Sequence, residues 1–284
     1  MSKIAPHDSA KRTLRERVAE IEWQYWIARL VPMLYVTVLT LILPKILTQS
    51  FVVSELGITP EQKVHQHLRA ISIKVIAHGE RIGSGVLLKR HHQVYTVITN
   101  AHVVQASSAP YQLQTHDGQV YAAALIAPPS GQNRDLSILR FQSHQRSYPT
   151  AKLATTVPKV GDRVWSAGFP TGGNDKVDRN LKDLEKAPWG LDTIDGQISQ
   201  VLPVAIAGGY RIGFDGAIRK GMSGGPVVDR SGRLIGINGV HANPLWDIPE
   251  ILENGSTASD ELKEQIHNAS WAIPIEYILD HTRL

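Results

Sequence analysis

The sequence predicts an all-β fold for most of the chain, with a separate apolar helix before it. Short β-rich runs recur about every 8–15 residues from Ala70 onward, and turn-forming Gly, Asn, Asp, Ser and Pro residues separate them. The apolar helix is predicted from an uncharged stretch, Leu30–Leu43, within the first fifty residues. Strands at this spacing build a β-sandwich or a pair of barrels, not βαβ units.

The expected elements follow in order along the chain. The β-rich runs are Ile71–Ala77, Gly85–Leu88, Val94–Thr99, Tyr121–Ala127, Leu136–Phe141, Val164–Gly168, Gly196–Val201, Val227–Val228, Leu234–Asn238 and Trp271–Ile273. Helices are expected from Ser259 or Asp260 to Ile266 and over Ile275–Leu284. A polar, Pro-containing seam at Tyr148–Lys159 divides a first half, 66–150, from a second half, 151–284.

Composition excludes several classes of function. The 284 residues contain no cysteine, so neither a disulfide nor a thiolate is expected. The net charge of +4 lies mostly in the first fifty residues, which leaves the rest of the chain near neutral and gives no basis for nucleic-acid binding. His-Glu-x-x-His, cysteine clusters and phosphate-binding glycine loops are absent from the sequence, so no metal or cofactor is expected.

The first fifty residues predict a membrane anchor. Residues 1–29 are basic and amphipathic, and residues 26–47 form an apolar stretch long enough for a span, with Arg29 and Lys45 near its ends. Aromatic residues precede the stretch, as at a membrane boundary. A tether, 48–65, follows. The excess of Lys and Arg before the span places the N-terminus in the cytoplasm and the rest in the periplasm, a lumen or the exterior. A helix buried in a soluble fold is the alternative.

The region around Ser223 carries the chemistry. Gly221, Gly224 and Gly225 surround this serine, which allows a sharp turn and close approach of a substrate backbone. The N–H groups of Gly221 and Ser223 are free to point at one developing oxyanion. A glycine-rich hairpin with a surface serine is the simpler alternative.

A base and an orienting acid lie upstream of that serine. His102 follows the apolar run Val94–Ile98, so a strand end positions an imidazole able to take a proton from a hydroxyl. Asp135 precedes a buried-looking strand, where a carboxylate needs a hydrogen-bond partner such as a histidine Nδ1–H. The alternatives are a surface histidine and a turn aspartate paired with Arg134.

These motifs together resemble the chymotrypsin-fold serine proteases, closest to the HtrA/Deg branch and related bacterial trypsin-like peptidases. The segments that carry the resemblance are Gly83-Ser-Gly-Val-Leu-Leu88, Thr99-Asn-Ala-His-Val-Val104, Asp135-Leu-Ser-Ile-Leu139, Ser166-Ala-Gly-Phe-Pro170, Gly196-Gln-Ile-Ser199, Asp215…Gly221-Met-Ser-Gly-Gly-Pro-Val227, Leu234-Ile-Gly-Ile-Asn238 and Ser270-Trp-Ala-Ile-Pro274. The resemblance implies two antiparallel six-stranded β-barrels. It also implies His102 as general base and acid, Asp135 as orienting acid and Ser223 as nucleophile, with an oxyanion hole at Gly221 and Ser223.

The same resemblance implies a substrate pocket and shows two departures. The implied pocket residues are Ala217, Gly239, Val240, His241, Trp271 and Ala272, which suit a small or medium apolar P1 side chain. Met222 stands where trypsin-like zymogens have an activating aspartate, so activation by that salt bridge is excluded. The segment 242–269 is longer than expected and is a candidate gate beside the pocket.

The sequence therefore predicts a membrane-anchored serine endopeptidase acting on protein or peptide substrates, with misfolded or membrane-associated proteins as candidates. A catalytically silent barrel pair used for binding or as a scaffold is the alternative function. A soluble protease with a buried N-terminal helix is a third possibility.

Overall fold

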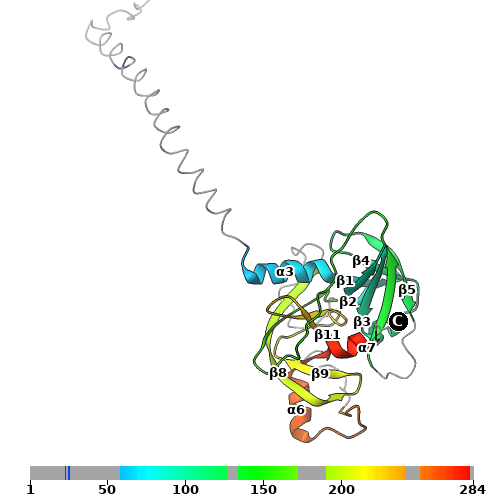
Figure 1. The fold of residues 1–284 in the computed structure, drawn as a ribbon, viewed down its shortest axis with the longest axis vertical. Coiled ribbons are helices and arrows are strands. Elements are labelled where there is room, and N and C mark those ends of the chain that lie inside the picture. Colours follow the sequence, from blue (N-terminus) through cyan, green and yellow to red (C-terminus); the bar gives the residue numbers. More distant parts are fainter. Residues whose placement is uncertain are drawn as a thin grey trace, which may run out of the picture. The chain divides into compact units, whose positions relative to one another are not determined.

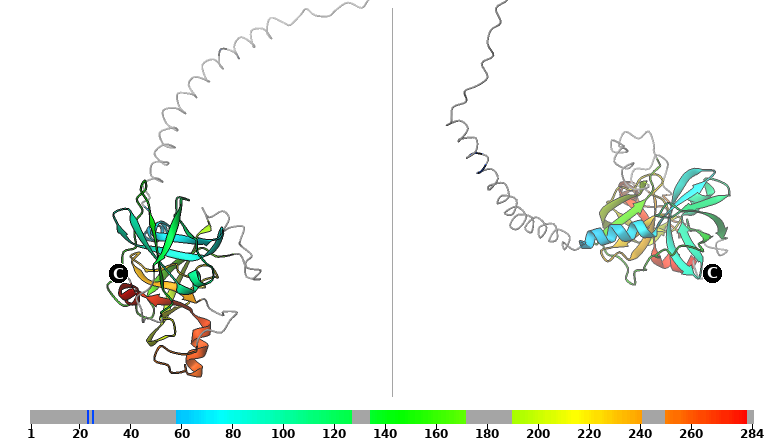
Figure 2. Two further views of the ribbon diagram at one scale, coloured as in Figure 1. Left: turned by 90° about the vertical axis from the view of Figure 1, so that its right-hand side faces the viewer. Right: turned by 90° about the horizontal axis from the view of Figure 1, so that it is seen from above.

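The computed structural model describes residues 23, 25, 58–126, 134–171, 190–240 and 250–281, and the chain divides into two compact units, Met1–Ile58 and Thr59–Leu284. The second unit contains two closed antiparallel barrels of six strands each (Figure 1). Figure 2 shows the cyan-to-green strands of the first barrel beside the yellow-to-orange strands of the second. The expectation of two six-stranded barrels is confirmed.

The first barrel is built from β1 to β6, with neighbours in the order β1-β2-β3-β6-β5-β4. Its strands are β1 (Ser72–Ala77), β2 (Glu80–His91), β3 (Val94–Thr99), β4 (Tyr111–Gln114), β5 (Val120–Ile126) and β6 (Ser137–Gln142). The register pairs Val97 with Leu139, and both side chains enter a core that also holds Ile73, Val75 and Leu87. Alternating apolar residues along each strand supply this core, because successive side chains point to opposite faces.

The second barrel has the order β10-β11-β12-β9-β8-β7. Its strands are β7 (Arg163–Gly168), β8 (Asp192–Ile206), β9 (Tyr210–Phe214), β10 (Pro226–Asp229), β11 (Leu234–Val240) and β12 (Ser270–Pro274). One of its core clusters includes Val164, Ile198, Ile212 and Phe214. The glycine-rich loop around Ser223 enters β10 directly, so the barrel wall fixes the position of that loop.

The predicted runs do not include two strands, β4 and β9. Strand β4 has only four residues, Tyr-Gln-Leu-Gln, and its buried Tyr111 and Leu113 alternate with Gln. Strand β9 contains Gly213, where an added Cβ would lie 3.1 Å from the ring of Trp271. Both strands are short, and they form because the closed barrel gives each of them a hydrogen-bonded neighbour on both sides.

Helix α3 (Pro60–Ile71) changes the expected boundary of the folded unit. The sequence assigns residues 48–65 to a tether, but α3 begins at Pro60, where Thr59 and Gln62 form a reciprocal capping box. Val64, Leu68 and Ile71 are buried in a core cluster that includes Trp165 of the second barrel. The helix packs on the second barrel although it precedes the first strand, so no tether occupies residues 60–65.

The other helices are α4 (Ala101–Gln105), α6 (Asp260–Asn268) and α7 (Ile275–His281). Helix α6 has Ser259 as its N-cap, and the Ser259 hydroxyl accepts a hydrogen bond from the N–H of Leu262 at 3.3 Å. Both helices expected in the C-terminal part are confirmed.

The expected membrane span, 26–47, lies outside the described residues, as does nearly all of segment 1–57. Within the part of the chain that the structure describes, no helix combines the length and the apolar character needed to cross a bilayer.

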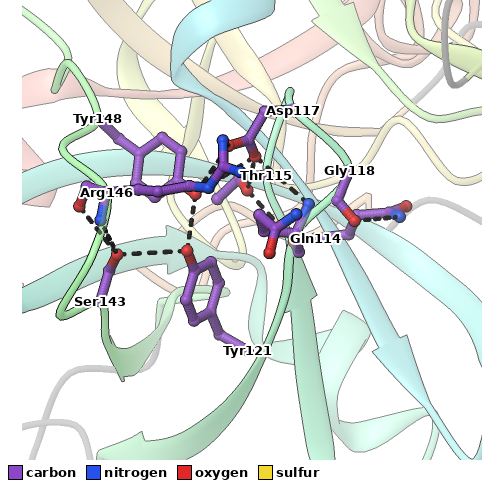
Figure 3. A network of polar contacts seen from close by, with 9 residues as sticks. Gln114, Thr115, Asp117, Gly118, Tyr121, Ser143, Arg146 and Tyr148 are labelled. Atoms are coloured by element: carbon purple, nitrogen blue, oxygen red, sulfur yellow. Dashed lines mark hydrogen bonds and ion pairs between the residues drawn. The ribbon is translucent and has the colours of Figure 1, made fainter.

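A polar network joins the turn between β4 and β5 to the chain that follows β6 (Figure 3). Asp117 accepts hydrogen bonds from Thr115 Oγ1 at 2.5 Å and from Arg146 Nη1 at 3.0 Å, and the Tyr148 hydroxyl lies 3.1 Å from its carboxylate. Burial alone would raise the pKa of Asp117, but these hydrogen bonds and the Arg146 charge lower it below its ordinary value. The network ties the β4–β5 turn to the chain where it leaves the first barrel.

Candidate active site

His102 and Asp135 form a two-point pair. The backbone N–H of His102 donates to Asp135 Oδ1 at 2.8 Å, and His102 Nδ1 lies 2.6 Å from Asp135 Oδ2. Strand β3 ends at Thr99, and His102 sits in the first turn of α4 with its side chain 47% exposed, against 16% for Asp135. The carboxylate is an acceptor only, so Nδ1 carries the hydrogen and leaves Nε2 as the free acceptor.

Asp135 is held from both barrels. Its N–H donates to the carbonyl of Gly208 at 2.9 Å, and Asn100 Nδ2 donates to its carbonyl at 2.9 Å. The hydroxyl of Tyr210, in the second barrel, donates to Asp135 Oδ2. Burial, followed by the Asp135 charge, raises the pKa of Tyr210 well above its usual value. Tyr210 therefore stays a neutral donor, and the carboxylate has two partners on one oxygen.

The loop around Ser223 depends on two glycines with positive φ. Gly221 has φ of +90°, and a Cβ there would lie 2.5 Å from the backbone N of Thr171. Gly224 has φ of +86°, and a Cβ there would overlap the carbonyl oxygen of Ser84. Only glycine fits both the conformation and the space. The loop is therefore pressed against the first barrel on one side of the serine.

Ser84, buried in β2, makes two hydrogen bonds to this loop and a third to Phe169, which follows β7. Its Oγ donates to the carbonyl of Gly221 at 2.7 Å and accepts from the N–H of Phe169 at 2.8 Å. Its N–H donates to the carbonyl of Ser223 at 2.9 Å. A side chain of the first barrel thus sets the backbone around a serine of the second.

Two contact paths connect Ser223 with the His102–Asp135 pair. The first runs through Ser84, whose carbonyl accepts from Thr99 Oγ1 at 2.6 Å, three residues before His102. The second begins at Ser223 Oγ, which donates to the carbonyl of Gly239 at 3.2 Å. A Cβ on Gly239 would overlap the Tyr210 ring, whose hydroxyl reaches Asp135. Hydrogen bonds and close contacts therefore link all three residues predicted from sequence, across the boundary between the two barrels.

The N–H groups of Gly221 and Ser223 have no acceptor among the described residues. The preceding carbonyls explain their direction. Lys220 O accepts from Thr171 N at 2.9 Å, and Met222 O accepts from Gly225 N at 3.0 Å. In a trans peptide the N–H points opposite to the preceding C=O. Because both carbonyls are held by hydrogen bonds, the N–H groups of Gly221 and Ser223 point away from Thr171 N and Gly225 N.

Met222 is fully buried in the second-barrel core. Its Cα lies close to Gly168, where an added Cβ would be 2.6 Å away. Its Sδ accepts from the N–H of Arg219 at 3.4 Å. An apolar side chain thus anchors the loop at the position where trypsin-like zymogens have an aspartate.

The structure separates the expected pocket residues. Ala217 is exposed, and Gly239 and Val240 lie at the end of β11. Trp271 and Ala272 are completely buried in core clusters, and Trp271 Nε1 donates to the carbonyl of Ile266 at 2.9 Å. These two side chains belong to the packed interior of the barrel and present no surface to a substrate. His241 and the part of the expected gate up to residue 249 lie outside the described residues.

Three residues around the site are not singled out by the sequence: Tyr210, Ser84 and Asn100. Ser84 lies within the quoted Gly83–Leu88 motif, and Asn100 within Thr99–Val104, but the sequence assigns no partner to either polar side chain. Tyr210 follows Gly208-Gly209 with no motif around it. Its role depends on an approach to Gly239, which only the folded barrel creates.

Comparison with known proteins agrees with this geometry. Residues 83–237, more than half of the chain, match the family described as trypsin-like peptidase domain. The chain is 27% identical over 158 residues to the serine protease Do-like HtrA of Bacillus subtilis, a match that covers 55% of this chain and 32% of the relative. It is 27% identical over 160 residues to the periplasmic pH-dependent serine endoprotease DegQ of Escherichia coli, covering 56% and 31%. A probable periplasmic DegP-like serine endoprotease of Brucella suis is 29% identical over 157 residues, covering 55% and 27%.

The matched region spans about a third of the length of these relatives. It includes the histidine, aspartate and serine motifs up to β11. The paired barrels, the site between them and the family match all agree. The chain therefore belongs to the trypsin-like peptidase domain family of serine proteases.

Proposed function

We propose that this chain is a serine endopeptidase in which Ser223 is the nucleophile, His102 the general base and acid, and Asp135 the orienting acid. The observation that carries the proposal is the two-point His102–Asp135 pair beside a serine loop fixed by Ser84. The alternatives, an isolated surface histidine and a turn aspartate, do not account for two hydrogen bonds between these residues at the boundary of the two barrels.

The first proton transfer runs from Ser223 Oγ to His102 Nε2. At rest the hydroxyl donates to the Gly239 carbonyl at 3.2 Å, so it must rotate about the Cα–Cβ bond before reaction. Asp135 stabilises the imidazolium that forms, because its Oδ2 already accepts the Nδ1 hydrogen.

The chemistry proceeds through an acyl-enzyme. Ser223 Oγ bonds to the substrate carbonyl carbon while its proton passes to Nε2, giving a tetrahedral oxyanion. The oxyanion collapses, the C–N bond breaks, and His102 returns the proton to the leaving amine. Water then attacks the ester with His102 again as base, which releases the acid and regenerates the Ser223 hydroxyl.

The N–H groups of Gly221 and Ser223 form the oxyanion hole in this proposal. Their lack of acceptors among the described residues, and the tied carbonyls of Lys220 and Met222, support a loop set before substrate arrives. Donors that need no reorganisation stabilise developing charge best, and loss of one such donor slows a serine protease about 10²–10³-fold.

The substrate backbone lies along the end of β11, where an extended peptide pairs with Gly239 and Val240 by strand addition. A small or medium apolar P1 side chain fits the apolar Ala217 and Val240. One carboxylate oxygen of the nearby acid Asp215 is already engaged, since Oδ1 accepts from the N–H of Gln197 at 2.6 Å. A peptide-library cleavage profile tests this preference, and cleavage mainly after Lys or Arg would contradict it.

The cellular part of the proposal rests on sequence. Residues 26–47 anchor the chain in a membrane, with the N-terminus in the cytoplasm and the barrels outside it, and the DegQ and DegP-like relatives are described as periplasmic. Misfolded or membrane-associated proteins are the proposed substrates. In sealed vesicles whose cytoplasmic face points outward, the barrels should resist added protease until detergent opens the membrane. Digestion of the barrels in intact vesicles would contradict the orientation.

One observation favours a silent binding module: the resting hydroxyl of Ser223 is bonded to Gly239. A fluorophosphonate probe on the full chain separates the two functions. Covalent labelling that disappears in Ser223→Ala and falls strongly in His102→Ala supports the enzyme. An intact, folded protein that takes up no probe is a scaffold, and the proposal of catalysis is then abandoned.

A further inference from the structure

A second site lies apart from Ser223, between α3 and the turn that joins β10 to β11. It is a pocket of about 350 Å³. The polar side chains that line it are Lys63, His67, Lys152, Arg230 and Ser231. None of them takes part in the site described above, and no acidic residue is among the described residues that line the pocket.

One wall of the pocket is a single face of α3. Pro60, Lys63, Val64 and His67 follow the i, i+3, i+4, i+7 spacing of one helical face. Val64 is 4% exposed and anchors this face, so Lys63 and His67 on either side of it are held at the pocket. The His67 ring lies against Gly232, where an added Cβ would be 3.4 Å from its Cδ2.

The opposite wall is a turn with a fixed conformation. Asp229 Oδ1 accepts from the N–H of Ser231 at 2.8 Å and of Arg233 at 2.9 Å, and Gly232 N donates to Asp229 O at 2.9 Å. These bonds hold Arg230 and Ser231 at the tip of the turn. The acid next to Arg230 in the chain, Asp229, therefore has its carboxylate engaged by the turn itself.

Lys152 closes the third side. Its carbonyl accepts from the N–H of Leu234 at 2.7 Å, and Ala154 N donates back to Leu234 O at 2.9 Å. Between these two bonds, Leu153 forms a parallel bridge with Leu234 of β11. Backbone pairing with the barrel therefore fixes the point from which the Lys152 side chain extends to the pocket.

The cations of the pocket form no ion pair within the described part of the chain. No carboxylate there forms an ion pair with Lys63, Lys152 or Arg230, whereas Arg163 on β7 is paired with Glu61 of α3 at 3.0 Å. Cations on a protein surface are often only solvated. Here, however, three of them converge on one cavity, and like charges brought together favour an anion between them.

His67 adds a buried nitrogen without a partner. Its Nε2 is inaccessible to solvent and has no hydrogen bond. Burial, followed by the charge of Lys152, lowers the pKa of His67 below its ordinary value. An anion in the pocket does not reach this inaccessible nitrogen, but its negative charge would offset the repulsion between Lys152 and a protonated His67 ring.

We propose that this pocket binds a phosphate group, held by Lys63, Lys152 and Arg230, with the His67 ring as part of the pocket wall. Ammonium and guanidinium groups are the usual partners of phosphate oxygens, and the Ser231 hydroxyl supplies a further donor. The group belongs either to free phosphate or to the headgroup of an anionic phospholipid. The second source is relevant because α3 follows the proposed membrane span in the chain.

The test uses the full chain in a nonionic detergent and follows the midpoint of thermal unfolding. A ligand that binds only the folded state raises this midpoint as its concentration increases. Inorganic phosphate is compared with chloride at equal ionic strength. A short-chain phosphatidylglycerol is compared with the matching phosphatidylcholine.

The test variant is Lys152→Gln/Arg230→Gln, and the matched control is Lys89→Gln/Lys159→Gln, which removes two exposed cations elsewhere. All four side chains are exposed, so both variants keep the core. Binding is expected to weaken about tenfold or more in the test variant, because two charged hydrogen-bond donors are lost. The control variant retains the full shift, including any general effect of phosphate on stability.

A shift that weakens only in the test variant supports the pocket. If phosphatidylglycerol then acts at far lower concentration than phosphate, the ligand is the lipid headgroup, and equal potency identifies the free anion. A shift of the same size in the test and control variants, or no shift with either ligand, overturns the proposal. The Ser223 probe reports separately on catalysis, so failure here leaves the proposed protease function unaffected.

Discussion

Replacing Ser84 by alanine tests whether the first barrel sets the conformation of the Ser223 loop, the proposed catalytic loop of the second barrel. The substitution removes only the hydroxyl, which donates to Gly221 O at 2.7 Å and accepts from Phe169 N at 2.8 Å. The backbone bond from Ser84 N to Ser223 O remains, so the loop keeps one of its attachments.

The magnitude follows from burial. Ser84 and Phe169 are fully buried, so the change removes the acceptor of a buried N–H and the donor to the Gly221 carbonyl. Each such unsatisfied group costs about 1–3 kcal/mol, so the two together give a loss of roughly 2–6 kcal/mol in the free energy of unfolding. The Gly221 peptide also becomes free to turn. We expect the rate of Ser223 labelling to fall about 10–100-fold, less than complete loss of an oxyanion donor.

Ser72→Ala is the matched control. Ser72 is equally buried in the same barrel, and its Oγ donates to the carbonyl of Leu68 at 2.7 Å, away from the nucleophile loop. This substitution should lower the free energy of unfolding by about 1–2 kcal/mol. Its labelling rate should equal that of the unchanged protein.

The assay combines urea unfolding with the second-order rate constant for fluorophosphonate labelling, measured well below the unfolding midpoint. If Ser84→Ala loses stability but labels as fast as Ser72→Ala, then Ser84 has only a structural role. The idea that it positions the oxyanion loop is then refuted.

Other contacts give three more predictions. Gly239→Ala places a Cβ onto the Tyr210 ring and should lower the free energy of unfolding by about 2–3 kcal/mol. In urea, the double variant Gly239→Ala/Tyr210→Ala should lose less than the sum of the single losses, and strict additivity would contradict the contact. The folded state raises the pKa of Tyr210, so the unfolded chain loses the phenolic proton first and the free energy of unfolding falls as pH rises above about 10. This fall should be less steep in Tyr210→Phe. An unchanged slope would contradict the raised pKa of Tyr210. Thr59→Ala removes the α3 capping box and should destabilise by about 1 kcal/mol in urea, whereas Gln66→Ala on the exposed face of the helix should not.

The strands of strongest apolar character are predictable from sequence. The run Val94–Thr99 has the same bounds as β3, because its residues are apolar or β-branched and it is buried against neighbours. Strands β4 and β9 escape prediction, since four alternating residues and a Gly-containing run carry little local signal. Their pairing comes from closure of each barrel, which acts over long sequence separations.

The site divides in the same way. The histidine, aspartate and serine motifs are recognisable because each is a short local pattern. Trp271 and Ala272 are pocket residues by resemblance, yet both are buried in the core, since a residue's position on a strand does not tell which face meets solvent. The first half of α3 is predicted as a tether from sequence, because Trp165, which shares its core cluster, lies far along the chain.

By itself, the sequence determined the all-β class, the order of the motifs and the chemistry available at His102, Asp135 and Ser223, because strand periodicity and glycine-rich turns are local properties. Only the tertiary structure decided that Tyr210 and Ser84 hold the site from opposite barrels and that Lys63, Lys152 and Arg230 share one pocket. Those contacts join residues distant in sequence, and they exist only after both barrels have closed and packed together.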